Sequence, residues 1–191
     1  MADTTSSHCV FPSRLSFFLD NPFRRLIEPP KKVLDLLDLS KNDVAVDFGC
    51  GTGYYTIPLA KRVQKAIGID VQSGMLKKAE DNAKKHSLNI KFLKSDGTRI
   101  PIPDSTADLI LMIRVFHEIE DKIQALKEFE RILKKDGKMA IKEKTKGSLL
   151  LTGPPIIKTS DIIRQLEDAG LKVIDQNEIG CETLIISKLS R

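Results

Sequence analysis

Short apolar segments alternate with amphipathic segments along most of the chain after about residue 30. The apolar segments have the length of strands, whereas the amphipathic ones repeat their apolar positions every three or four residues, as helices do. A regular alternation of this kind predicts parallel strands joined by helical crossovers, with helices covering both faces of the sheet.

The expected elements follow directly from this pattern. Strands are expected at 44–48, 66–70, 90–94, 107–113 and 138–143. Helices are expected at 55–63, 73–86, 122–133 and 160–169. Ser73 and Ser160 are candidate N-caps, and Asp136-Gly137 is expected to end the third helix. The buried stripe of that helix is expected to comprise Ile123, Leu126, Phe129, Ile132 and Leu133.

The last two apolar runs, 171–175 and 183–187, are joined by a short loop. They must be antiparallel, because parallel neighbours need a long crossover. The expected fold class is therefore α/β, an open doubly wound and mostly parallel sheet with an antiparallel C-terminal edge hairpin. Ligands of such sheets bind beyond the carboxyl ends of the strands. The loops after Phe48, Asp70, Ser95 and Ile113 are thus expected to surround one crevice.

A glycine-rich loop follows the first strand and opens the first helix, with the sequence Asp47-Phe48-Gly49-Cys50-Gly51-Thr52-Gly53. Glycine lets the backbone turn sharply and lets a ligand approach the main chain closely. Dinucleotide folds use Gly-x-Gly-x-x-Gly, whereas this loop continues the alternate spacing. Asp47 suits a ligand ammonium, and the helix start at Gly53 suits a carboxylate.

Two further acids end later strands. Asp70 lies about 20 residues beyond the glycines, where an acid can accept hydrogen bonds from both ribose hydroxyls. Asp96, followed by Gly97, can accept a hydrogen bond from an adenine amino group. Together with the glycine loop, these acids predict a nucleoside ligand that also carries an amino-acid group.

The run VAVDFGCGTG resembles the first motif of class I S-adenosylmethionine-dependent methyltransferases. GID ending at Asp70, KSDGTRIPIPDSTADLI at 94–110 and LKEFERILKKDGKMAI at 126–141 resemble the later motifs in order and spacing. The resemblance covers about residues 33–189 and is closest to the small-molecule "type 11", ubiquinone-biosynthesis-like subset.

This resemblance implies a Rossmann-like domain over residues 31–191 that binds S-adenosylmethionine and releases S-adenosylhomocysteine. Val71 and Met75 would flank the adenine. The cofactor-binding residues that it implies are Asp47, Gly49, Cys50, Gly51, Gly53, Asp70, Val71, Met75, Asp96, Gly97 and Arg114.

The loop after the strand at 107–113 is expected to face the donor methyl group. There His117 is a candidate catalytic base or acceptor-orienting group, with Glu118 beside it. Adjacent residues on a helix do not face one another, so His117 as a helix cap is the alternative. Residues 1–30 are expected to form a lid over the acceptor. The candidate substrate contacts are His8, Cys9, Phe18, Arg24 and Tyr54.

Composition narrows the partners. The net charge is +5, but the lysine pairs are interleaved with acids, which favours a solvated surface over a nucleic-acid patch. The three cysteines are far apart, so neither a disulfide framework nor a metal site is expected. No apolar run approaches the roughly 20 residues that span a bilayer, and the start lacks the order of a signal peptide. We therefore expect a cytoplasmic monomer or homodimer that acts on a small molecule without a membrane partner.

Three alternatives remain open at this stage. An RNA methyltransferase is disfavoured because the Asn/Asp-Pro-Pro-aromatic motif is missing after the strand at 107–113. A metalloid (arsenite-type) methyltransferase would use Cys9. A non-catalytic donor-binding module would need no acceptor loop, against which His117 and Glu118 argue.

Overall fold

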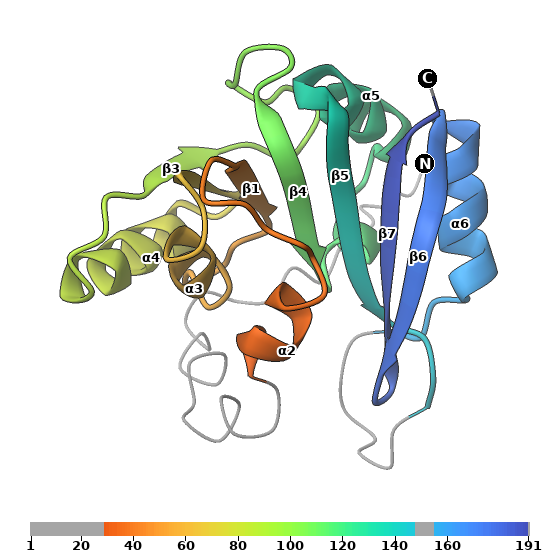
Figure 1. Cartoon of the computed structure of the whole chain (residues 1–191), viewed down its shortest axis with the longest axis horizontal. Coiled ribbons are helices and arrows are strands. Elements are labelled where there is room, and N and C mark those ends of the chain that lie inside the picture. Colours follow the sequence, from red (N-terminus) through yellow and green to blue (C-terminus); the bar gives the residue numbers. More distant parts are fainter. Residues whose placement is uncertain (1–28, 148–154, 191) are drawn as a thin grey trace, which may run out of the picture.

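The computed structural model describes residues 29–147 and 155–190, and a seven-stranded sheet lies at its centre (Figure 1). The strands are β1 (Val44–Phe48), β2 (Lys65–Asp70), β3 (Lys91–Lys94), β4 (Ala107–Ile113), β5 (Leu133–Lys144), β6 (Leu171–Ile179) and β7 (Glu182–Leu189). Their order across the sheet is β3-β2-β1-β4-β5-β7-β6. β1 to β5 run parallel to one another, whereas β7 is antiparallel to both β5 and β6. The predicted fold class is confirmed.

Helices cover both faces of this sheet. The described helices are α2 (Pro30–Leu34), α3 (Thr56–Ala60), α4 (Ser73–Lys85), the 3-10 turn η2 (Phe116–Glu118), α5 (Lys122–Ile132) and α6 (Thr159–Asp168). Phe129 of α5 and Ile162 of α6 belong to one apolar core, while Leu34 of α2 and Leu59 of α3 belong to a second. None of the helices within the described ranges is long and apolar enough to cross a membrane.

The two central strands meet where the site is expected. β1 and β4 are hydrogen-bonded neighbours, and Phe48 at the end of β1 pairs with Met112 of β4. Along β4, Ile110 and Met112 enter the core under α5, whereas Leu109 enters the core under α3. The chain order reverses between these two strands, which makes their carboxyl ends the topological switch point of the sheet.

Two predicted N-caps are wrong. The N-cap of α4 is Gln72 and that of α6 is Lys158, so Ser73 and Ser160 lie inside the first turns. Neither helix has a side-chain cap, whereas Asp121 caps α5 by accepting a hydrogen bond from the backbone of Gln124. Each serine therefore marked the start of its helix correctly, although it does not cap the helix.

The turn predicted at Asp136-Gly137 is also wrong, because both residues lie within β5. β5 begins at Leu133, directly after α5, and Leu133 pairs with Ala107 of β4. The register shifts between this pair and the next one, Leu109 with Lys138, so Asp136-Gly137 lie in an irregular stretch of the strand and the helix has already ended at Ile132.

The buried stripe of α5 also differs from the predicted one, because Ile123 is 73% exposed. Ile123 lies in the first turn, and the buried residues of the helix are Ala125, Leu126, Phe129 and Ile132.

Candidate functional site

The glycine loop is tied to the end of β2 by its backbone. The N–H groups of Gly49 and Cys50 both donate to the carbonyl oxygen of Ile69, at 2.8 and 2.9 Å. The N–H of Gly51 donates to Oδ2 of Asp70 at 2.9 Å. Gly51 has a φ of +54°, and no heavy atom lies within 4 Å of the position that a Cβ would occupy. The loop therefore exposes main chain that a ligand can approach closely.

Gly49 brings the loop after β4 against the glycine loop. A Cβ at Gly49 would lie 2.2 Å from Cγ2 of Val115, which no real side chain tolerates. Val115 belongs to the segment that the sequence places opposite the donor. Because residue 49 has no side chain, the glycine loop and the loop after β4 can come into contact at the switch point.

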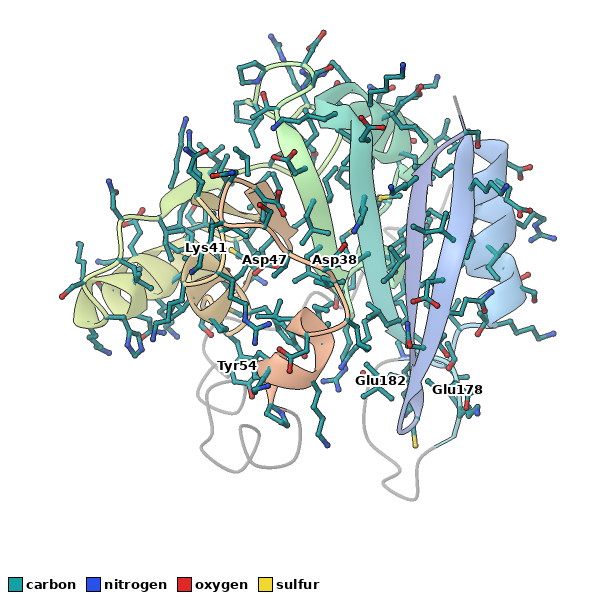
Figure 2. The ribbon with its side chains drawn as sticks, viewed as in Figure 1. Asp38, Lys41, Asp47, Tyr54, Glu178 and Glu182 are labelled. Carbon is teal, nitrogen blue, oxygen red and sulfur yellow. The ribbon has the colours of Figure 1, made fainter. Side chains whose placement is uncertain are left out.

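Asp47 lies buried behind the glycine loop, with only 2% of its surface exposed (labelled in Figure 2). Its Oδ2 accepts a hydrogen bond from the hydroxyl of Thr56 at 2.6 Å. Burial raises the pKa of Asp47 to about 7, against the hydrogen bond from Thr56 and with the charge of Asp70 adding to it. A ligand ammonium near this carboxyl would favour its ionised form. The ammonium contact stays a prediction.

Asp70 ends β2 with both carboxylate oxygens on backbone donors, Gly51 at Oδ2 and Gln72 at Oδ1. Burial raises the pKa of Asp70, although these two hydrogen bonds oppose the rise. Each oxygen keeps a further acceptor direction, so the carboxylate can still bind ribose hydroxyls. Beside it, Val71 is 45% exposed whereas Met75 is 2% exposed. Val71 thus has apolar surface that an adenine ring can contact, whereas Met75 is buried and its predicted contact with the adenine stays a prediction.

The loop that carries Asp96 lies over the end of β1. A Cβ at Gly97 would approach Cζ of Phe48 to 3.0 Å. Oδ1 of Asp96 accepts hydrogen bonds from the hydroxyl and the backbone N–H of Thr98, at 2.7 and 2.9 Å. These hydrogen bonds lower the pKa of Asp96, which is exposed and ready to accept from a ligand.

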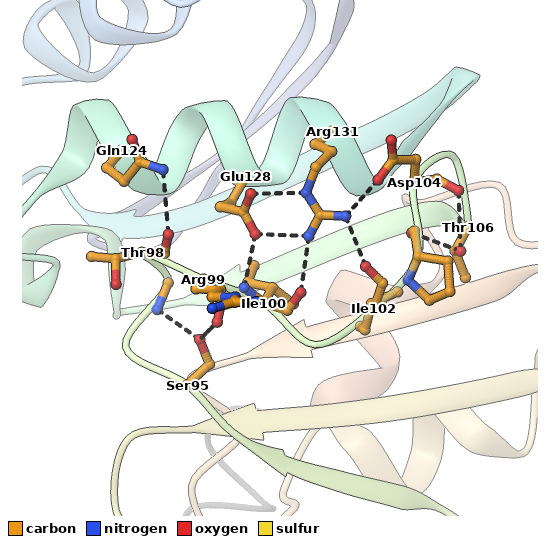
Figure 3. Close-up of polar contacts among 12 residues, drawn as sticks. Ser95, Thr98, Arg99, Ile100, Ile102, Asp104, Thr106, Gln124, Glu128 and Arg131 are labelled. Atoms are coloured by element: carbon orange, nitrogen blue, oxygen red, sulfur yellow. Dashed lines mark hydrogen bonds and ion pairs between the residues drawn. The ribbon is translucent and has the colours of Figure 1, made fainter.

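Glu128 and Arg131 of α5 fasten this loop to the body of the protein (Figure 3). Oε2 of Glu128 accepts the N–H of Ile100 at 2.8 Å. Arg131 donates to the carbonyl oxygens of Ile100 and Ile102, at 2.9 and 2.8 Å, and also binds Glu128 and Asp104. Neither Glu128 nor Arg131 was assigned a role from the sequence. Their spacing of three within a helix was the available signal.

His117 has a partner that sequence reasoning missed. Its ring Nδ1 lies 2.9 Å from Oε2 of Glu143, and its backbone N–H donates to Oε1 of the same carboxylate at 3.3 Å. Glu143 is completely buried near the end of β5. Glu118, the predicted partner, is farther away, with Oε1 3.8 Å from Nε2 of His117. A charged residue at the carboxyl end of a central strand was the signal that pointed to Glu143.

A second buried ion group occupies the other face of β5. Oε2 of Glu182 lies 2.6 Å from Nζ of Lys142, and Oε1 of Glu182 accepts a hydrogen bond from Nε of Arg114 (Glu182 is labelled in Figure 2). Lys142 is fully buried, and Arg114 adopts a φ of +58°, which is uncommon for a residue with a side chain. Arg114 was predicted to bind the cofactor, and its guanidinium is held here by β7. The cofactor contact stays a prediction.

The remaining predicted residues lie apart from this assembly or outside the described ranges. His8, Cys9, Phe18 and Arg24 belong to residues 1–28, which are not described. Tyr54 is 9% exposed and packs edge-on against Tyr55, with ring centroids 5.5 Å apart.

Two further observations bear on the chemistry that the described residues can support. Cys50 is buried, and burial, with the charges of Asp47 and Asp70, raises its thiol pKa, which suits packing better than metalloid binding. Within residues 29–147 and 155–190, no group of three or more His, Cys, Asp and Glu side chains could hold a metal ion.

A cavity of about 550 Å³ lies at the opposite ends of the strands, away from the carboxyl ends of β1 and β4. Its lining includes Ser105, Leu133 and Leu189, at the amino ends of β4 and β5 and the end of β7. The glycine loop and His117 lie at the other ends of these strands. We therefore place the site on the loops of the switch point and not in this cavity.

Comparison with known proteins identifies the family of this chain. Residues 46–141 match a family model described as a methyltransferase domain. A solved structure of an S-adenosylmethionine-dependent methyltransferase from Aquifex aeolicus is 31% identical and superimposes with a TM-score of 0.87, covering 94% of this chain and all of that one.

Curated relatives match over shorter stretches. A demethylmenaquinone methyltransferase from Geobacillus sp. is 30% identical over 132 residues, which cover 67% of this chain and 56% of that protein. The chain spans about half the length of the first such relatives. A 23S rRNA (uracil(1939)-C(5))-methyltransferase from Haemophilus parainfluenzae is 47% identical over 64 residues, only 33% of this chain and 15% of that protein.

Proposed function

Because this chain belongs to the family of class I S-adenosylmethionine-dependent methyltransferases, we propose that it transfers the methyl group of S-adenosylmethionine to a small-molecule acceptor. One observation carries this proposal. The glycine loop is bonded to Asp70, open at Gly51 and pressed against the loop of His117 through Val115. A donor held on the first loop would therefore meet an acceptor held beside the second.

The residues fit the parts of the donor in turn. Main chain at Gly51 would hold its amino-acid group, with Asp47 behind the loop facing the ammonium. Asp70 would bind the ribose hydroxyls, and Val71 and Asp96 would contact the adenine. When bound, the sulfonium supplies a methyl group that is already activated for displacement. Positioning by the protein then supplies much of the rate enhancement.

The acceptor that we propose is a small aromatic compound with ring hydroxyl groups. Demethylmenaquinone, named for the Geobacillus relative, is a naphthoquinone whose reduced form carries two such groups. His117 with Glu143, and Arg114 with Glu182, are polar groups that can face a hydroxyl at this edge of the sheet. His117 and Glu118 stay predicted catalytic residues in this proposal.

Calorimetric titration of the purified protein tests the donor. We expect S-adenosylmethionine and S-adenosylhomocysteine to bind with dissociation constants of about 1–100 μM, near common substrate levels, and NAD not to bind. Silence for both sulfur ligands would overturn the proposed function. Formation of S-adenosylhomocysteine with a naphthohydroquinone as acceptor then tests the acceptor class.

An RNA acceptor is the second candidate, because the rRNA methyltransferase from H. parainfluenzae matches a stretch of this chain. The net charge of +5 is compatible with weak polyanion binding. Turnover with a ribosomal RNA fragment but not with a naphthohydroquinone would favour this candidate. Salt-sensitive binding of the RNA without turnover would count as non-specific electrostatics.

A further inference from the structure

Glu143 is a buried carboxylate on a central strand, a place where a charge is costly unless it is bonded. Its two oxygens face the ring and the backbone of one residue, His117. Apart from this pairing, a leucine or valine at position 143 would suit the core better, as the neighbouring Ile141 does. The expense of burying this carboxylate therefore points to a role exerted through His117.

We propose that Glu143 is a positioning residue, which holds the His117 ring so that Nε2 accepts a proton from a hydroxyl group of the methyl acceptor. This inference rests on the proposed function and narrows its substrate class to acceptors with an acidic hydroxyl, such as a phenol or hydroquinone. Glu118 lies on the Nε2 side of the ring, at 3.8 Å.

The direction of the ring decides which nitrogen is free. A carboxylate can only accept, so the neutral ring must carry its proton on Nδ1 to bond Oε2 of Glu143 at 2.9 Å. The lone pair then lies on Nε2, away from Glu143. A carboxylate behind Nδ1 fixes tautomer and orientation in this way in other histidine bases.

The proton transfer completes a balanced reaction. The hydroxyl proton of the acceptor passes to Nε2. The electron pair that it leaves on the acceptor oxygen forms the new bond between that oxygen and the methyl carbon. The bond between that carbon and sulfur breaks with its electrons on sulfur, which leaves a neutral thioether. His117 then returns its proton to water.

Three charged groups face His117 and set its protonation. Burial by itself would lower the pKa of His117, but the hydrogen bond and charge of Glu143 and the charge of Glu118 outweigh it and raise the pKa. The charge of Lys122, at the start of α5, opposes the rise. We therefore expect activity to rise with pH through a value above that of a free histidine, as the ring loses its proton.

The first test needs no acceptor. Nitrogen–proton correlation spectra of the histidine rings report the tautomer of the neutral ring directly. His117→Gln assigns the signals among the three histidines of the chain, and exposed His86 is the internal reference. We expect the Nδ1–H tautomer for His117 at high pH. The Nε2–H tautomer, which free histidine prefers, would overturn the proposal.

The second test removes the charge and keeps the shape. In Glu143→Gln we expect the pKa of His117 to fall and kcat with a naphthohydroquinone to drop about 10- to 100-fold. The rising limb of the pH–rate profile should move to lower pH. Glu167→Gln makes the same change on the exposed face of α6 and should alter none of these values. An unchanged pKa of His117 in folded Glu143→Gln would contradict the proposal.

Donor binding separates the two levels of inference. Both Glu143→Gln and His117→Gln should bind S-adenosylmethionine within about twofold of the original protein, because the hydrogen bonds of these residues run between them and not to the glycine loop. If the original protein does not bind S-adenosylmethionine, the proposed function is wrong. A wrong tautomer in a protein that binds the donor would overturn only the role of Glu143.

Discussion

The donor side and the acceptor side of this site are built in different ways. On the donor side, main-chain groups of one contiguous motif form the surface for the ligand. Asp70 is attached to this motif by the hydrogen bond from the backbone N–H of Gly51. On the acceptor side, the contacts are side-chain ion pairs across the sheet. His117 and Glu143 are 26 residues apart, and Arg114 and Glu182 are 68 apart. The donor side leaves space for a ligand, whereas on the acceptor side buried charged residues hold a loop in place.

This difference predicts where each kind of change should act. A substitution at Gly51, the open position of the glycine loop, should remove donor affinity with little effect on folding. Substitutions in the acceptor-side ion groups should lower the free energy of unfolding or the rate of transfer, and leave donor affinity unchanged. Three changes, taken from the largest expected effect to the smallest, can break this division.

Gly51→Arg should have the largest effect. The new side chain would enter the open space in front of the loop and occupy the place of the donor. We expect S-adenosylmethionine to bind about a thousandfold more weakly by calorimetry, or about 4 kcal/mol. The left-handed backbone at this position should cost only about 1 kcal/mol of stability.

Gly147→Arg is the matched control, because a Cβ there also meets no atom within 4 Å. It should bind the donor normally. Normal binding by Gly51→Arg would show that the donor does not lie on this loop, and the division would fail on its donor side.

Glu182→Ala should give the next largest effect, on stability. It removes the carboxylate that is bonded to both fully buried Lys142 and Arg114. Removing one partner of a buried ion pair costs about 3 kcal/mol or more, which urea unfolding would measure. Donor affinity of the folded protein should stay within about twofold.

The double variant Lys142→Met, Glu182→Leu checks the cause of this loss. It removes both buried charges, so we expect most of the lost stability to return. If the double variant is as unstable as Glu182→Ala, the loss comes from packing and not from an unpaired charge.

The same division explains what the sequence could predict. The sequence predicted that the glycine loop, Asp70 and Asp96 lie at strand ends, and the structure has them there, because each strand is defined by its own local pattern. Glu143 was missed, because its meaning depends on its contact with His117, 26 residues away. His117 was predicted in the loop after β4, but only adjacent Glu118 was named beside it, since sequence alone offers only local neighbours.

The fold shows the same limit. The mostly parallel sheet and its antiparallel edge hairpin followed from the alternation of elements, while the join at Leu133 and the length of the hairpin depended on pairing between distant strands. β6 runs to Ile179, beyond the predicted 171–175, because it pairs with β7 as far as Glu182. β7, at Glu182–Leu189, extends only slightly beyond the predicted 183–187.

Arg131→Leu should have the smallest effect, and it tests a side-chain clamp on the donor side. Arg131 and Glu128 hold the loop of Asp96 on α5. Losing these partly exposed bonds should lower stability by about 1–2 kcal/mol and weaken donor binding about three- to tenfold. Arg131→Lys, which keeps the charge but cannot form the fork, should recover only part of either loss.

A pH series identifies the clamp as the cause. The bond from Arg131, with that from Ile100, outweighs burial and lowers the pKa of Glu128 from 4.5 to about 2. A depressed carboxylate pKa stabilises the fold above its unfolded value, and this stabilisation is lost as the pH falls toward the folded value. The stability gap between the original protein and Arg131→Leu should therefore be widest above pH 5 and shrink by pH 3 in urea unfolding. A gap that stays constant over this range would assign the loss to packing of the arginine stem and not to the clamp.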